Sequence, residues 1–337
     1  MDMTTFDNGI FASPVIGANN IEIFTGSRAN VYFVDGDKGN DGNSGLSPML
    51  AKKTIQAAVT TAATRNLLQK SGSVVYVKAK YMAAGSTDPS SYAETVIIPA
   101  AGGERMAIIG ISNGRVQMGL PQIKKGSGTS PQITVRASGC TIASMGVNGI
   151  DATGGGILLD DDSSTKTACG TTIINCHFKN CVGSTATDCR TGGAIMWAST
   201  GCAWQVLIKG NRFYKNVGDV VLKGTSVSVP QDVIIEDNIF SGPATSVDCN
   251  LYLAGGSGMN GVIVRNNVFP SVLPALSSGS IVRYVDMTGC VGIFTNNYVG
   301  GVYTTAGFGA AKAAAKIPAT VGIAHNYSDS GLIVREA

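Results

Sequence analysis

The chain has 337 residues, of which 14% are charged and 44 are glycine. Its 25 basic and 22 acidic residues leave a net charge of +3, which is too small and too scattered to indicate a nucleic-acid partner. No apolar run approaches the ~20 residues that a membrane helix needs, and the N-terminal sequence lacks the basic and apolar regions of a signal peptide, so we expect neither a membrane span nor classical secretion.

Residues 1–30 follow no repeat and are too apolar for a solvated tail. We expect them to form a docking arm that contacts a partner protein or a neighbouring copy through hydrophobic anchors and strand addition. The alternative is a strand laid along the chain's own fold. The anchors that we expect to contact the partner are Phe6, Ile10, Phe11, Val15 and Ile16.

The stretch "VDGDKGNDGNSGLSP" after the arm is rich in Asp, Asn and Gly but does not match a calcium loop. Counted from Asp35, the ligand positions 5 and 12 of an EF-hand would be Gly39 and Leu46. We therefore predict that residues 35–43 are a solvated turn. The turn leads to a short amphipathic helix over residues 54–66, with Thr54 as the N-cap, that covers one end of the fold.

A repeat of about thirty residues dominates the second half of the chain. Short strands lead into "NCHF", "GNRF", "DNIF", "NNVF", "NNYV" and "HNYS". Between these segments lie Gly, Ser, Thr and Asn and not helical patterns, so the repeat predicts an all-β, single-stranded right-handed parallel β-helix. We predict that one asparagine of each coil stacks into an amide ladder, and that the Phe or Tyr after it fills the interior. The predicted ladder consists of Asn211, Asn238, Asn267, Asn297 and Asn326.

The eight cysteines are expected to be reduced core residues, because the chain is long and carries no signal peptide. Cys176, His177, Cys181 and Cys189 cluster in sequence, but their gaps are irregular and no C-x-x-C pair is present. We therefore predict no metal site and no cofactor.

The segments "VYFVDGDKGNDGNSGLSPMLAKKTIQAAV" and "AETVIIPAAGGERMAIIGI", followed by the Asn-Phe coils, resemble the pectate-lyase-like right-handed β-helix superfamily. Within it, the sequence is similar to short β-helix proteins of tailed-bacteriophage particles, of the head-decoration and tail-appendage type. The resemblance implies a β-helix domain over residues 31–337 and a location in the virion, assembled in the cytoplasm of the bacterial host. It implies a major capsid protein or a tail protein as partner. Homo-oligomerisation, with a trimer as the first expectation, would suit symmetric sites on the particle.

The same fold also carries enzymes, so catalysis has to be argued from residues. Polysaccharide hydrolysis needs two carboxylates that face one cleft. Asp161, with Asp188 and Arg190 in the next coil, would supply such a set if one coil placed Asp161 above Asp188. A carboxylate run after an apolar strand is also typical of a solvated bend. We therefore predict a non-enzymatic virion protein, with a tailspike-like polysaccharide depolymerase as the alternative.

Glycan binding without chemistry is the other form of this alternative. Exposed aromatic rings stack on sugar rings, and Trp197, Trp204 and Tyr214 are candidates for this contact with a bacterial surface glycan. Trp197 and Trp204 flank a short loop that would place both on one edge of the solenoid. The competing interpretation is that these aromatics pack on the core or at a contact between subunits.

Overall fold

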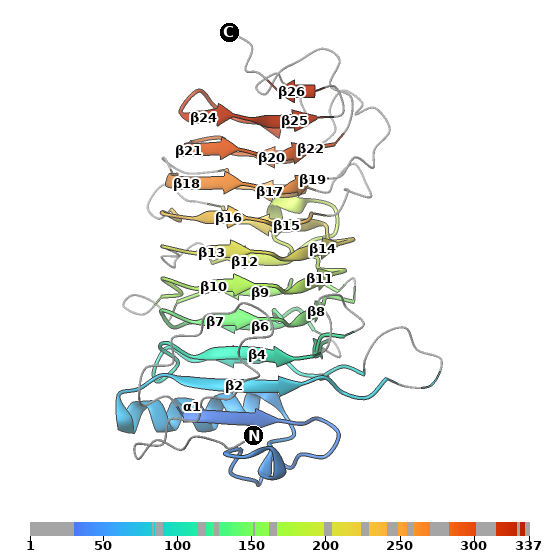
Figure 1. Ribbon diagram of the computed structural model, residues 1–337, viewed down its shortest axis with the longest axis vertical. Helices are drawn as coiled ribbons and strands as arrows, with labels where there is room; N and C mark the ends of the chain where they lie inside the picture. The colour runs from blue at the N-terminus through green and yellow to red at the C-terminus, as the bar shows by residue number, and fades with distance from the viewer. Residues whose placement is uncertain are drawn as a thin grey trace, which may run out of the picture.

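The computed structural model confirms the predicted right-handed parallel β-helix (Figure 1). Coils stack from the N-terminal base to the C-terminal end, and one helix, α1, lies across the base. The structure describes residues 30–82, 84, 90–112, 119–124, 128–150, 152–161, 167–198, 204–223, 229–240, 249–254, 259–269, 283–300, 315–328 and 331–333. The predicted docking arm, apart from residue 30, lies outside these ranges.

Three faces of parallel strands form the solenoid. The first face contains β1 (Asn30–Val34), β2 (Ser73–Lys78), β4 (Ala107–Ile111), β7 (Thr141–Ala143), β10 (Thr172–Ile174), β13 (Leu207–Lys209), β16 (Ile234–Glu236), β18 (Met259–Arg265), β21 (Cys290–Thr295) and β24 (Val321–Ala324). The second face contains β5 (Gln122–Ile123), β8 (Gly146–Asn148), β11 (His177–Lys179), β14 (Arg212–Tyr214), β19 (Val268–Phe269), β22 (Tyr298–Val299), β25 (Asn326–Ser328) and the antiparallel β26 (Gly331–Ile333). The third face contains β3 (Val96–Ile98), β6 (Ile133–Val135), β9 (Ile157–Leu159), β12 (Ile195–Trp197), β15 (Gly218–Val221), β17 (Cys249–Tyr252), β20 (Arg283–Asp286) and β23 (Ala315–Lys316).

The bend between the first and second faces holds the asparagine ladder. From Asn238 onward, the Oδ1 atom of each ladder asparagine accepts from the backbone N–H and the Nδ2 group of the asparagine one coil earlier, and Asn238 receives both bonds from Asn211 at 2.9 and 3.1 Å. The Oδ1 atom of Asn211 accepts from the backbone N–H of Cys176 at 2.8 Å. The Nδ2 group of Asn238 donates to the Ile208 carbonyl at 3.0 Å as well as to Asn267. The same pattern continues through Asn297 to Asn326. All five side chains are at most 1% exposed, so the ladder satisfies buried backbone groups that a sharp bend leaves unpaired.

The residue before each ladder asparagine makes the bend. Asp237, Asn266, Asn296 and His325 have φ angles of 53° to 57°, and the equivalent Gly210 has φ 65°. Aspartate, asparagine and glycine tolerate this left-handed conformation better than other residues. The doubled "NN" of two repeats therefore has two roles, because the first asparagine turns the chain and the second joins the ladder.

A phenylalanine stack fills the interior beside the ladder. Neighbouring rings of Phe178, Phe213, Phe240 and Phe269 lie 5.1, 4.9 and 4.6 Å apart, with interplanar angles of 12° or less. These phenylalanines stand two residues after the ladder position, and the residue in between points outward. The prediction that the tyrosine after the asparagine fills the interior is therefore wrong for Tyr298 and Tyr327, which are 40% and 51% exposed.

Helix α1 (Ile55–Gln69) covers the base and extends beyond the predicted end at residue 66. The Thr54 hydroxyl caps it by accepting from the backbone N–H of Ala57 at 3.2 Å. The Glu94 carboxylate, from the first coil, accepts hydrogen bonds from the first two N–H groups of the helix, those of Ile55 and Gln56. The Gln56 side chain in turn pairs with both backbone groups of Ile97 on β3, so the helix also satisfies an edge strand.

The Asp- and Asn-rich turn directs its carboxylates to backbone donors. Asp35 accepts from the N–H groups of Asp37 and Lys38 and forms a 2.6 Å ion pair with Lys78. Asp41 accepts from the N–H groups of residues 53 and 54. The turn then passes through the 3₁₀ helix η2 (Pro48–Leu50) before α1 begins. The carboxylates therefore hold the turn against the base of the β-helix.

Two of the cysteines form a disulfide, so the expectation that all eight are reduced is wrong. Cys189 begins the short 3₁₀ helix η3 (Cys189–Thr191), and Cys249 begins β17; their Cα atoms are 5.7 Å apart. The pairing was not visible in the sequence because sixty residues separate the two positions. Among the other cysteines of the described ranges, Cys140, Cys176 and Cys290 are buried with free thiols.

We predict that Asn238→Ala destabilises the fold by roughly 3 kcal/mol or more. The change leaves the buried N–H of Asn211 without its acceptor, removes one of the two acceptors of the Asn211 Nδ2 group and takes a donor from the Ile208 carbonyl, and each such loss costs about 1–3 kcal/mol. Urea unfolding at neutral pH measures the difference. The exposed Asn260→Ala is the control, with an expected change within about 0.5 kcal/mol. Equal effects of the two substitutions would contradict a stabilising ladder.

Candidate functional site

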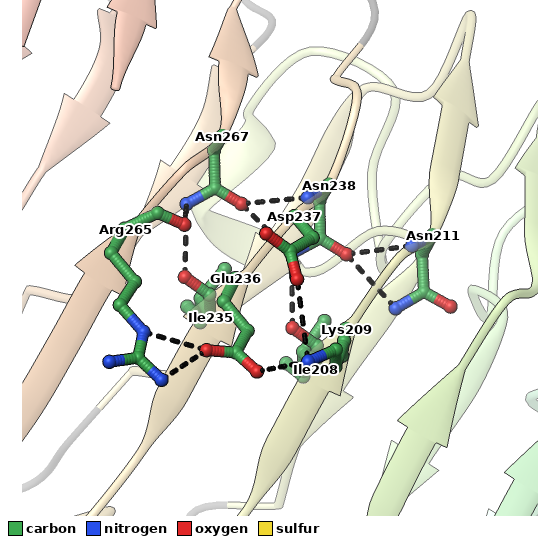
Figure 2. Close-up of polar contacts among 9 residues, drawn as sticks. All are labelled: Ile208, Lys209, Asn211, Ile235, Glu236, Asp237, Asn238, Arg265 and Asn267. Atoms are coloured by element: carbon green, nitrogen blue, oxygen red, sulfur yellow. Dashed lines mark hydrogen bonds and ion pairs between the residues drawn. The ribbon is translucent and has the colours of Figure 1, made fainter. Parts of the chain in front are cut away.

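A group of four charged side chains crosses three coils on the outer side of the first face (Figure 2). Glu236 on β16 lies between Lys209 on β13 and Arg265 on β18, which are its in-register neighbours. Its Oε1 atom is 2.8 Å from the Lys209 Nζ atom, and its Oε2 atom is 2.6 Å from an Arg265 terminal nitrogen. Asp237, at the bend, lies 3.4 Å from the same Nζ atom. We call these four residues the charge bridge.

The charge bridge holds Glu236 ionised. Burial by itself raises the pKa of Glu236, but the hydrogen bonds from Lys209 and Arg265 outweigh it, and the pKa of this carboxyl lies below its usual range. The hydrogen bond to Glu236 raises the pKa of Lys209 in return. A general acid for glycoside cleavage needs the opposite shift of its pKa. The charge bridge is therefore suited to joining adjacent coils and not to protonating a leaving group.

The predicted catalytic set is not brought together. Asp161 follows the C-terminal end of β9, whereas Asp188 lies before the start of β12. Because β9 and β12 pair in parallel with Trp197 opposite Leu159, the two carboxylates lie at opposite ends of the paired strands. The register thus does not meet the condition for a catalytic pair, that one coil places Asp161 above Asp188.

Asp188 and Arg190 have a local structural role. The Asp188 carboxylate caps η3 by accepting from the backbone N–H of Arg190, and it also pairs with the guanidinium at 2.7 Å. The hydrogen bond from the Arg190 side chain lowers the pKa of Asp188. This pair holds the short helix from which the disulfide to β17 starts.

The candidate aromatics separate into one buried and two exposed side chains. Trp197 is only 8% exposed and packs in the hydrophobic core, so its ring cannot stack on a sugar, and the competing interpretation of core packing holds for this tryptophan. Trp204 and Tyr214 are 44% and 49% exposed. Tyr214 lies on β14 of the second face, with the Lys215 Nζ atom 5.3 Å from its ring centroid.

Sequence reasoning missed a further set of surface residues on the second face. The residues that directly follow the ladder positions pair in register from coil to coil and point outward. We call this set the outer strip: His177, Arg212, Ile239, Val268, Tyr298 and Tyr327. The signal was present in the sequence for Asn211, Asn238, Asn267 and Asn297, because the position after each of them is followed by a buried phenylalanine or valine, and alternation along a strand places it outside.

No three side chains of the His, Cys, Asp and Glu types gather as a metal ion would require within the described part of the chain. In the same ranges, no helix is both long and apolar enough to span a membrane.

The ion pairs of Glu236 predict a pH dependence of stability. The pKa of Glu236 is lower in the folded state than the ordinary 4.5. Its ion pairs therefore stabilise the fold above that pH, and this stabilisation is lost as the pH falls through the folded-state pKa. Glu236→Gln should lower the free energy of unfolding at pH 7 by about 1–3 kcal/mol, and the difference from the unchanged protein should shrink toward pH 3.

Denaturant unfolding at pH 7, 5 and 3 measures this effect. The exposed Asp232→Asn is the matched control, with an expected change within about 0.5 kcal/mol at each pH. A Glu236→Gln difference that stays constant across the three pH values would show that the ion pairs are not its cause.

Comparison with known proteins gives no family for this chain. No protein-family model matches the sequence, and no curated protein matches it. Among solved structures, the chain is similar to the GH136 lacto-N-biosidase from Eubacterium ramulus, both as the native protein and as the selenomethionine derivative. Both are 10% identical, with 90% of this chain and 68% of the other chain covered, and the TM-scores are 0.33 and 0.32. A likeness at this level carries no information about activity.

Proposed function

We propose that this protein is a non-enzymatic structural component of a bacteriophage particle, a head decoration or a tail appendage that docks through residues 1–30. The proposal that the protein is not an enzyme rests on the contacts that carboxylates on the described surface make. Glu236 bridges two cations, Asp160 pairs with Arg136 at 2.8 Å, and Asp188 caps η3. These carboxylates are held ionised or engaged in contacts that stabilise the coils.

The fold supports a mechanical role. Each coil is joined to the next by strand hydrogen bonds, ladder amides and stacked rings add to these in the later coils, and α1 covers the base. Such a solenoid is stiff, because each coil is held by its neighbours over its whole circuit. The particle itself is suggested by the resemblance of the base and the Asn-Phe coils to phage β-helix proteins, and the apolar arm is the segment suited to attachment.

Docking is tested by co-expression of the full chain with the major capsid protein and with the tail proteins of the same phage genome. We expect one of them to co-purify with the full chain, and deletion of residues 1–29 to abolish the association without changing the melting temperature. Phe6→Glu with Phe11→Glu should act like the deletion, whereas Thr4→Ser with Thr5→Ser is the matched control.

Two results would contradict this function. The first is association with none of the capsid and tail proteins. The second is release of reducing ends or of unsaturated uronates from bacterial capsular polysaccharide at a rate that Asp161→Asn abolishes, which would establish the depolymerase instead.

A further inference from the structure

The Cys189–Cys249 disulfide joins two coils that are not neighbours. Cys189 lies in the connection from β11 to β12, and Cys249 begins β17. The strands of the third face follow one another in the order β12, β15 and β17, and Cys249 is in register with Gly218 of β15. Strand hydrogen bonds join adjacent coils, so the disulfide adds a link across the intervening coil of β15.

The segment that carries Cys189 is a loop that closes on itself. The backbone N–H of Ser184 donates to the Thr191 carbonyl at 3.3 Å, and the ion pair of η3 lies within the loop. Gly183 and Gly192 meet at its neck, where a Cβ atom on Gly183 would lie 2.5 Å from the Gly192 nitrogen. We call residues 184–191 the clasp loop. Its own hydrogen bonds and its glycine neck allow it to move as a unit.

The clasp loop packs closely against β15 and β17. Gly218 of β15 has no side chain, and a Cβ atom there would lie 2.7 Å from the Gly192 carbonyl oxygen and 3.0 Å from that of Cys189. This approach leaves Cys189 and Cys249 1% and 2% exposed, with Cα atoms 5.7 Å apart, as is usual for a disulfide. Closure of the loop on β15 therefore both aligns the two cysteines and shields them.

Three other buried thiols are kept apart from this pair. Cys140, Cys176 and Cys290 belong to the hydrophobic core, and burial raises the pKa of each thiol to about 12. Thiol–disulfide exchange proceeds through the thiolate, so these three cysteines do not react in the folded chain. Cys189 and Cys249 lie outside the core cluster that the described residues form, so the core itself does not depend on their bond.

We propose that Cys189 and Cys249 form a reversible redox clasp, closed under oxidising conditions and open under reducing conditions. In the thiol form the clasp loop lifts at its neck, and one cysteine thiolate attacks a low-molecular-weight disulfide such as oxidised glutathione. This step forms a mixed disulfide and releases one glutathione thiolate. The second cysteine thiolate attacks the protein sulfur of the mixed disulfide and releases the other glutathione. Two protein thiols are thereby oxidised, one glutathione disulfide is reduced to two thiols, and the two protons pass to the glutathione.

The clasp changes how firmly the middle of the solenoid is held. The bond closes a covalent loop with a sequence separation of 60 that contains β12 to β16, which restricts the separation of these coils from β17. In the thiol form, strand hydrogen bonds and the asparagine ladder still hold the coils. The bacterial cytoplasm keeps thiols reduced, so in a particle assembled there the clasp closes after release from the cell. This timing alone rests on the proposed function.

Limited trypsin digestion of the full chain tests the clasp, because the exposed Arg190 lies in the clasp loop. The protein is incubated with oxidised glutathione or with a phosphine reductant, and mass spectrometry follows cleavage of the Arg190–Thr191 bond. Cleavage after the exposed Lys38 at the base is the internal reference. We expect reduction to accelerate cleavage at Arg190 at least tenfold, without a change at Lys38 or in the far-UV circular dichroism. Re-oxidation of the undigested protein should restore the protection.

Substitutions assign the effect to the clasp. Cys189→Ser with Cys249→Ser should be cleaved at Arg190 at the fast rate under both conditions. Gly218→Ala keeps both thiols but places a methyl group where the clasp loop rests, so disulfide formation with oxidised glutathione should slow at least tenfold, as measured by alkylation and mass. Gly322→Ala is the matched control, because the nearest atom to its Cβ would be 3.8 Å away, and it should oxidise like the unchanged protein.

Four results would overturn the clasp. They are equal cleavage at Arg190 under both conditions, failure of the two thiols to form the bond with oxidised glutathione, unfolding of the chain on reduction, and oxidation of Gly218→Ala at the unchanged rate. Every measurement uses the isolated chain. Failure of the docking experiment with capsid and tail proteins would therefore leave the clasp standing, and failure of the clasp would leave docking standing.

Discussion

One interaction, the amide-to-amide hydrogen bonding of the ladder asparagines, sets the register of the strands on both sides of the bend from Asn211 to Asn326. An asparagine side chain carries both a donor and an acceptor, so each one bonds in both axial directions at once and leaves no buried group unpaired. The bond from Asn238 to Asn267 fixes the register of β16 against β18, and a slip by one residue would turn every side chain of the coil to the opposite side. The interior phenylalanine stack and the exposed strip both follow from that register.

Polar groups elsewhere on the molecule join neighbours in a similar way. Glu236 connects three coils through Lys209 and Arg265, and Glu94 connects the first coil to the N-terminus of α1. In both cases the carboxylate accepts hydrogen bonds that stabilise the fold. A carboxylate that turned toward a substrate would leave these donors unpaired. A surface built in this way is more suited to resisting deformation and presenting a regular array than to transferring protons.

The regular stacking of the coils also aligns equivalent surface residues in columns parallel to the solenoid axis. The outer strip runs along the stack because each coil contributes one residue at the same angular position. The third face has a comparable column that is largely buried and includes Met196 and Val221.

The amino-acid sequence by itself determined the architecture, the ladder and the helix that covers the base, because each is encoded by residues at a recurring or local spacing: Asn211 to Asn326 recur at about one per coil, and Thr54 precedes an apolar helical face. The outward side of Tyr298 was also readable from the alternation along its strand, but only the tertiary structure decided which loops meet. Cys189 met Cys249 across sixty residues, and Asp161 and Asp188 fell at opposite ends of paired strands. The reason is that the segments between strands differ in length from coil to coil, so their positions depend on how neighbouring coils stack and not on the repeat itself.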